Sequence, residues 1–241
     1  DSENSAFEYS DKITNSDGAS LSSYQGFKVY GNSHGFIKGY PSSRHSLSCS
    51  VIAQDGRDMQ RDYAYTVDRE FDKLDTAILV GEKAAQAAVK ILNPKKLDTC
   101  QLPVIFHAEI ASSLFGHLVS AISGGSLYRK SSFLMDSLGT QIFPDFVTIE
   151  ERPHLQKGLA SSPFDSEGVQ TKDLDVIESG ILTSYLLTGY SSRKMGMQTT
   201  GHAGGIHNWL VKATDPSLEA LLKKMDKGLL VTELMGQGVN T

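Results

Sequence analysis

The sequence predicts an α+β protein, in which an antiparallel sheet with a packed helix is followed by a second mixed α/β unit. Apolar and polar residues alternate over much of 25–67, which is typical of half-buried strands. Apolar residues recur at helical spacing over 82–92 and again over 110–122. We therefore expect a central α+β domain over residues 1–97 and a C-terminal domain over residues 102–241.

The first sheet is expected to be an antiparallel meander. Its alternating runs are separated by two turn signals, one at 32–35 and one at the Asp55-Gly56 pair. An Asp-Gly pair favours a tight type I′ hairpin, because both central residues of that turn need a positive φ. The segment 35–41 is predicted to be a short strand between these turns.

The helix over 82–92 has charged and amide side chains on one side and alanine, valine and leucine on the other. Asn93 precedes Pro94, and proline both restricts the residue before it and lacks a backbone N–H. We expect the helix to stop at Asn93, and the stretch from 93 to 102 to be the boundary between the domains.

The second domain is predicted to begin with a short strand over 103–106 and a helix over 108–122. Gly124 and Gly125 follow, and glycine is common where a helix ends in a left-handed residue, so this pair is expected to close the helix. The last helix is predicted to have Asp215 as N-cap, Pro216 at its first position and Gly228 as its stop. Three further strand segments are expected over 146–150, 175–188 (a hairpin turning at 179–180) and 229–234.

Composition excludes several functional classes. The chain has 241 residues with 23 Lys plus Arg against 28 Asp plus Glu, a net charge of -5, which lacks the positive field of a nucleic-acid binder. Its apolar runs are too short to span a bilayer, so we expect no membrane partner. Cys49 and Cys100 form no CxxC pair, which fits a reducing compartment and predicts a cytoplasmic protein.

The start of the second predicted helix contains a possible metal motif. His107, Ala108 and Glu109 have the HxE form of zinc deaminases, but the PCxxC that completes such a zinc site does not occur. HExxH, the common metallopeptidase motif, is also absent. His107 and His117 are ten residues apart, roughly 80° from a shared helix face. A regular helix would not bring both imidazoles to one ion.

The segment TGHAGGIHNW, residues 200–209, is the other candidate site. Gly204 and Gly205 allow a ligand to approach the backbone closely, and His202 and His207 flank them. Such a loop can clamp a peptide backbone, or it can be an irregular turn with two solvated histidines. The sequence also lacks the GxSxG motif of serine hydrolases and the GxGxxG and GxxxxGK[ST] motifs of nucleotide sites.

Several separate segments resemble the PmbA/TldD family of bacterial metallopeptidase-related proteins, also called modulators of DNA gyrase. They are PVIFHAEIASSLFGHLV, GGSLYRKSSFLMDSLG, GLASSPFDSEGV, TGHAGGIHNW, VTELMGQGV, NSHGFIKGYPSSRHSLS and DYAYT. The resemblance covers the middle of such a protein, so we expect an N-terminal part and a C-terminal end to be missing. It implies a component of a two-subunit zinc metallopeptidase that degrades unfolded or small peptides, trims a leader peptide and removes an antitoxin.

In that family, the TldD-like catalytic subunit is expected to carry HExxxH on the helix that corresponds to 108–122. This sequence departs from the motif. If His107 takes the first histidine position, Ala108 and Ser112 replace the other two residues; if Glu109 takes the glutamate position, Ala108 and Ser113 replace both histidines. Serine and alanine are not zinc ligands, so the resemblance implies a subunit that binds no cofactor itself, with zinc in a TldD-like partner.

The sequence therefore predicts a peptide-binding loop formed by His202, Gly204, Gly205 and His207, with no catalytic or metal residue. Glu109 is the fallback catalytic residue, and His107 and His117 are the fallback metal ligands. Two other functions stay open: a metallopeptidase in its own right with non-standard ligands, and a regulator that binds gyrase or another partner without proteolysis. We also expect the chain to form a homodimer when it is isolated.

Overall fold

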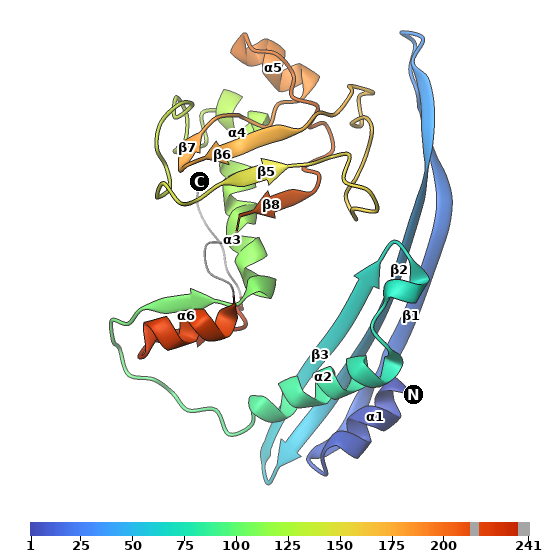
Figure 1. The fold of residues 1–241 in the computed structure, drawn as a ribbon, viewed down its shortest axis with the longest axis vertical. Helices are drawn as coiled ribbons and strands as arrows, with labels where there is room; N and C mark the ends of the chain where they lie inside the picture. The colour runs from blue at the N-terminus through green and yellow to red at the C-terminus, as the bar shows by residue number, and fades with distance from the viewer. Residues whose placement is uncertain (213–216, 236–241) are drawn as a thin grey trace. The chain divides into compact units, whose positions relative to one another are not determined.

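The computed structural model describes residues 1–212 and 217–235 (Figure 1). The chain divides into two compact units. Unit 1 comprises 1–31 and 37–98, and unit 2 comprises 32–36 and 99–241. Both units mix helices with sheets, so the predicted α+β class is confirmed. Among the described residues, no helix is long and apolar enough to cross a membrane.

Unit 1 contains a three-stranded antiparallel sheet in the order β1-β2-β3 (Figure 1). Its strands are β1 (Ile13–Gly31), β2 (Ile37–Asp55) and β3 (Asp58–Asp68). Both predicted turns are present, but the second is not the expected type I′ turn, because Gly56 has a positive φ and Asp55 does not. The expected separate strand over 35–41 is also wrong, because 37–41 is the first part of β2. The strand β1 also begins well before residue 25. Register shifts between Ile13 and Gly18 interrupt the pattern there, which hid this part of the strand from sequence periodicity.

Two helices cover one face of this sheet: α1 (Ser2–Tyr9), which the sequence analysis did not predict, and α2 (Ala77–Lys90). The side chain of Thr76 caps α2 by accepting a hydrogen bond from the amide of Leu79 at 3.2 Å. The helix ends three residues before the predicted stop at Asn93, whose φ of 55° is not helical. The core of unit 1 consists of Ala6, Ile13, Cys49, Val51, Ala53, Val80, Ala84, Ala85 and Ala88.

Gly81 makes the contact between α1 and α2 possible. It is buried, and a Cβ atom at this position would lie 2.0 Å from the carbonyl oxygen of Ser2 and 2.3 Å from Oγ of Ser5. The backbone of α1 therefore occupies the space that any side chain on α2 would fill at this point.

Unit 2 contains a four-stranded antiparallel sheet in the order β7-β6-β5-β8. These strands are β5 (Ile149–Glu151), β6 (Leu174–Glu178), β7 (Ile181–Leu182) and β8 (Trp209–Val211). The predicted hairpin turn is present at Ser179 and Gly180, both of which have positive φ. A separate parallel pair joins β4 (Val104–Phe106) to β9 (Leu229–Val231).

The helices of unit 2 are α3 (Ala108–Ala121), α4 (Gly124–Tyr128), α5 (Gly189–Met195) and α6 (Leu218–Met225). The predicted role of Gly124 and Gly125 is wrong: they begin α4 rather than close α3. Gly124 is buried, and a Cβ there would lie 2.1 Å from Oγ of Ser191, so close packing on α5 explains this glycine. Ser217 caps α6, whereas Asp215, Pro216, Gly236 and Gly238 lie outside the described residues.

Replacing Gly81 by alanine should lower the free energy of unfolding of unit 1 by about 1–3 kcal/mol, because the new methyl group would overlap the backbone of α1. Gly116→Ala in α3 is the matched control: nothing lies within 4 Å of a Cβ there, and alanine is the better helix former by about 1 kcal/mol. Denaturant unfolding followed by circular dichroism would measure both changes. Equal effects of the two substitutions would contradict this packing.

Candidate functional site

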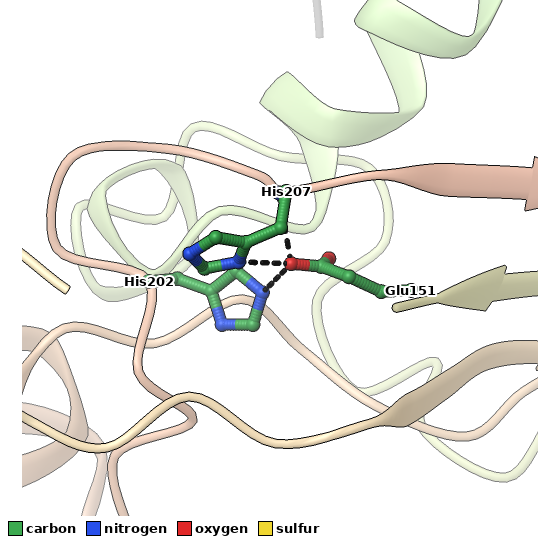
Figure 2. Close-up of side chains that lie close together, drawn as sticks. All are labelled: Glu151, His202 and His207. Atoms are coloured by element: carbon green, nitrogen blue, oxygen red, sulfur yellow. Dashed lines mark hydrogen bonds and ion pairs between the residues drawn. The ribbon is translucent and has the colours of Figure 1, made fainter. Parts of the chain in front are cut away.

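The glycine loop, defined as residues 200–208, leads into β8 in unit 2. Its two histidines do not face solvent: His202 is 6% exposed and His207 is 9% exposed. Figure 2 shows both imidazoles turned toward the carboxylate of Glu151, the last residue of β5. The alternative of a turn with two solvated histidines is therefore wrong.

One carboxylate oxygen joins the two histidines. Oε1 of Glu151 lies 3.0 Å from Nε2 of His202 and 2.5 Å from Nδ1 of His207. The backbone amide of His207 donates to the same oxygen at 2.9 Å. The other oxygen, Oε2, accepts a hydrogen bond from the indole N–H of Trp209 at 2.7 Å. Glu151 thus connects β5 to both ends of the loop segment 202–207 and to the first residue of β8.

Glu151 is ionised in this position although it is 1% exposed. Burial alone raises the pKa of a carboxyl group, but the hydrogen bonds from His202, His207 and Trp209 outweigh burial and lower the pKa of Glu151 to about 2. Within the described ranges, its only ion-pair partners are the two imidazoles. The negative charge is therefore buried without a lysine or an arginine beside it.

The exposed tip of the glycine loop has unused backbone groups. Gly204 and Gly205 have φ of 105° and 115°, which side-chain-bearing residues rarely adopt. The amide of Ala203 donates to Oδ2 of Asp165 at 3.0 Å, which fixes one end of the tip. No hydrogen bond of the described structure uses the amide of Gly204 or Ile206, and both residues are exposed.

The fallback residues on α3 do not form a metal site. His107 caps the helix, with its Nδ1 accepting from the amide of Glu109 at 3.4 Å. Ser112 and Ser113 donate to carbonyl oxygens of their own helix, at 2.8 and 2.7 Å. In the part of the chain that the structure describes, the only group of three potential metal ligands is Glu151, His202 and His207, so neither His107 nor His117 belongs to one.

Sequence reasoning missed Glu151. The predicted strand over 146–150 began before β5 and ended one residue too early, so Glu151 was not considered. The signal was the period of two: Ile149 is buried, so the residue two positions later points to the same side of the sheet. Glu150 points to the other side and pairs with Arg152 and Lys212.

This arrangement can do two things chemically. It can fix the backbone of the glycine loop, because four N–H groups from the loop and from β8 converge on one carboxylate. It can also supply a His₂Glu donor set for a metal ion. It is not suited to acid–base work on a peptide, because Glu151 is buried and both of its oxygens are engaged.

Replacing Glu151 by alanine should lower the free energy of unfolding of unit 2 by about 3 kcal/mol or more, because buried donors that lose their acceptor cost about 1–3 kcal/mol each. Glu150→Ala is the control and should cost less than about 1 kcal/mol, because Lys212 is exposed and Arg152 keeps Asp175 as a partner. Trp209 is the only tryptophan in the chain, so its fluorescence during denaturant unfolding reports on this site. Similar losses for both variants would show that Glu151 does not stabilise the loop.

Known proteins are similar to this chain over its whole length. The profile of the PmbA/TldA metallopeptidase central domain matches residues 1–92, and the profile of the PmbA/TldA metallopeptidase C-terminal domain matches residues 99–241. Metalloprotease PmbA of Escherichia coli O157:H7 is 58% identical over 238 residues, and the Metalloprotease PmbA homolog of Haemophilus influenzae is 57% identical over 239 residues. Each alignment covers 99% of this chain and 53% of the relative, so the chain spans about half the length of these proteins.

More distant proteins are also similar to this chain, in structure or in sequence. The crystal structure of a Thermotoga maritima protein described as a modulator of a DNA gyrase matches with a TM-score of 0.89 at 28% identity, covering 99% of this chain and 56% of that one. A Zinc metalloprotease TldD homolog of Saccharolobus solfataricus is 26% identical over 216 residues, covering 80% of this chain and 46% of the relative. By the match of both domain profiles and the identity to PmbA proteins, this chain belongs to the PmbA/TldD family.

Proposed function

We propose that this chain belongs to a PmbA-like subunit, also called TldE, that holds no catalytic zinc on α3 and acts within a heteromeric cytoplasmic zinc metallopeptidase. The partner is a TldD-like catalytic subunit that supplies the zinc. The substrates are unfolded or small peptides, as in the trimming of a leader peptide or the degradation of an antitoxin. Membership of the PmbA/TldD family and the occurrence of a TldD homolog among the relatives support this proposal.

The side chains of α3 are the observation on which the proposal depends. A catalytic zinc generally needs three protein ligands and an open position for water. On α3, the HExxxH positions contain alanine and serine in either register, and the hydroxyls of Ser112 and Ser113 donate to the helix backbone. His107 is left without a second imidazole at helical spacing. This segment cannot build the site that the family motif provides.

The tip of the glycine loop is the proposed contact with the peptide or with the catalytic subunit. Gly204 and Gly205 leave the backbone uncovered, and the amides of Gly204 and Ile206 are available as donors. Extended peptides gain affinity from such main-chain hydrogen bonds. His202 and His207, which the sequence analysis placed among the peptide-binding residues, are buried, so in this proposal they hold the tip in place and do not touch the peptide.

The test is a reconstitution with the full-length subunit that contains this chain. We expect no cleavage of an unstructured peptide by this subunit alone, with or without added zinc, and zinc-dependent cleavage once a TldD-like subunit is added. His107→Ala should leave the activity of the mixture unchanged, because α3 contributes no ligand. Cleavage by the subunit alone that a chelator abolishes would overturn the proposal in favour of a peptidase in its own right.

Self-association of the isolated chain is a further expectation. The strand β1 is 19 residues long and lies at an edge of its sheet. Unpaired edge strands form hydrogen bonds with other chains. Light scattering should detect a dimer or larger species whose mass rises with concentration, and a monomer at high micromolar concentration would count against it.

A further inference from the structure

We propose that Glu151, His202 and His207 bind one divalent transition-metal ion of the zinc type in unit 2. This site is separate from α3. A metal ion at this site goes beyond the proposed function, which concerns catalytic zinc only. It also differs from the sequence-based expectation that this chain binds no metal. That expectation depended on the α3 segment alone, whereas Glu151 belongs to β5.

The donor set fits such an ion. Two imidazole nitrogens and one carboxylate oxygen, one from each residue, lie within 4.8 Å of one another (Figure 2). Imidazole nitrogen and carboxylate oxygen are ordinary zinc ligands, and two histidines with one glutamate form a known zinc-binding combination. The three residues come from β5 and from the two sides of the glycine loop, so one ion would connect both segments.

Neighbouring groups orient two of the ligands. Metal-binding side chains commonly use their second polar atom to contact an outer residue, which fixes the ligand geometry. Here Trp209 donates to Oε2 of Glu151 and leaves Oε1 directed at the histidines. Oγ1 of Thr200 lies 2.9 Å from Nδ1 of His202, on the side of the ring opposite Glu151.

The hydrogen bonds of Thr200 can accommodate either tautomer of His202. The hydroxyl accepts from the amide of Leu187 at 2.7 Å, and its single proton has a backbone acceptor, the carbonyl of Tyr185, at 3.2 Å. Without a metal, the hydroxyl donates to Nδ1 of His202 at 2.9 Å, and the Nε2–H of the ring faces Glu151. When the hydroxyl donates to the carbonyl of Tyr185 instead, Nδ1 of His202 can carry the proton and Nε2 can offer its lone pair to the ion.

Charge supports the same conclusion. Buried charges in proteins are paired or coordinate metals, and Glu151 is a buried anion with no lysine or arginine partner among the described residues. A divalent ion would compensate this charge while both imidazoles stay neutral. The protons that now face Oε1 would move to the opposite ring nitrogens, so binding requires no net proton release.

Each opposite nitrogen can accommodate its proton. Nδ1 of His202 faces Thr200. Nε2 of His207 makes no hydrogen bond to another described residue. Among the described residues, the only side-chain polar atom that is fully buried without a partner is Oγ of Ser2, so Nε2 of His207 is open to water. The ion would replace the direct hydrogen bonds between the imidazoles and Oε1. Because Glu151 is inaccessible to a peptide, the role of the ion is to hold the glycine loop and not to catalyse.

The test is metal binding by the chelator-stripped chain, measured with Co²⁺ and Zn²⁺ alone. We expect one Co²⁺ per chain with the visible absorption of a tetrahedral site, displaced by Zn²⁺, and a simultaneous change in Trp209 fluorescence. Thr200→Val leaves all three ligands in place but removes the contact to His202 and the acceptor of the Leu187 amide. It should weaken Co²⁺ binding roughly 10- to 100-fold, with Trp209 fluorescence checking that the variant is folded. His207→Ala should abolish the spectrum, whereas His107→Ala and His117→Ala should leave it unchanged.

Two results would overturn the metal site: no stoichiometric Co²⁺ uptake by the unmutated chain, or uptake that His207→Ala does not change. The first would indicate that an imidazolium paired with Glu151 balances the charge without a metal. These measurements need no peptide, no partner and no folded Glu151 variant. A negative result for Co²⁺ binding would therefore not contradict the proposed function, and a negative result in the reconstitution assay would not contradict the metal site.

Discussion

The ionised carboxylate of Glu151 is the interaction on which the candidate site depends. It accepts hydrogen bonds from two imidazoles, one indole and one backbone amide, and these donors come from the glycine loop and the start of β8. The energetics are asymmetric: a satisfied buried network contributes modestly to stability, whereas a network that loses its central acceptor is strongly destabilised. The loop therefore has a defined conformation only while Glu151 is present and ionised.

This anchor explains how an exposed glycine-rich tip can be well positioned. Gly204 and Gly205 have backbone angles that are accessible to glycine and unfavourable for most other residues. Without hydrogen bonds on either side, two adjacent glycines would make the segment flexible. With His202 and His207 fixed on either side and Ala203 bound to Asp165, the tip is short and held at both ends, so its free amides point in fixed directions.

The sequence predicted those elements that strict periodicity or turn chemistry determines. The hairpin at Ser179-Gly180 was correct, because both residues have positive φ, which glycine and short polar residues tolerate. The turn at Asp55-Gly56 was correct in position but not in type, because only Gly56 has a positive φ there. The start of β1 was not predictable, because its register shifts break the alternation. The role of Gly124 was misjudged, because its cause is close packing on a residue far away in the chain.

Only part of the candidate site could be predicted from the sequence. The glycine loop and its histidines stood out as a local motif, but their partner lies about 50 residues earlier in the chain. Local patterns cannot pair residues across that separation, and an acidic pair at a strand end is usually solvated. The family relationship indicated the fold and the departure from the zinc motif on α3, whereas the function of this chain has to be argued from its own site.

Amide hydrogen exchange of the glycine loop, resolved by residue, would show whether buried Glu151 fixes this loop. The amide of His207 donates to buried Glu151, whereas the amides of Gly204 and Ile206 are exposed and without a partner in the described structure. We expect strong protection at His207 beside rapid exchange at Gly204 and Ile206, and loss of the protection at His207 in Glu151→Ala. Uniformly rapid exchange across these residues in the unmutated chain would contradict it.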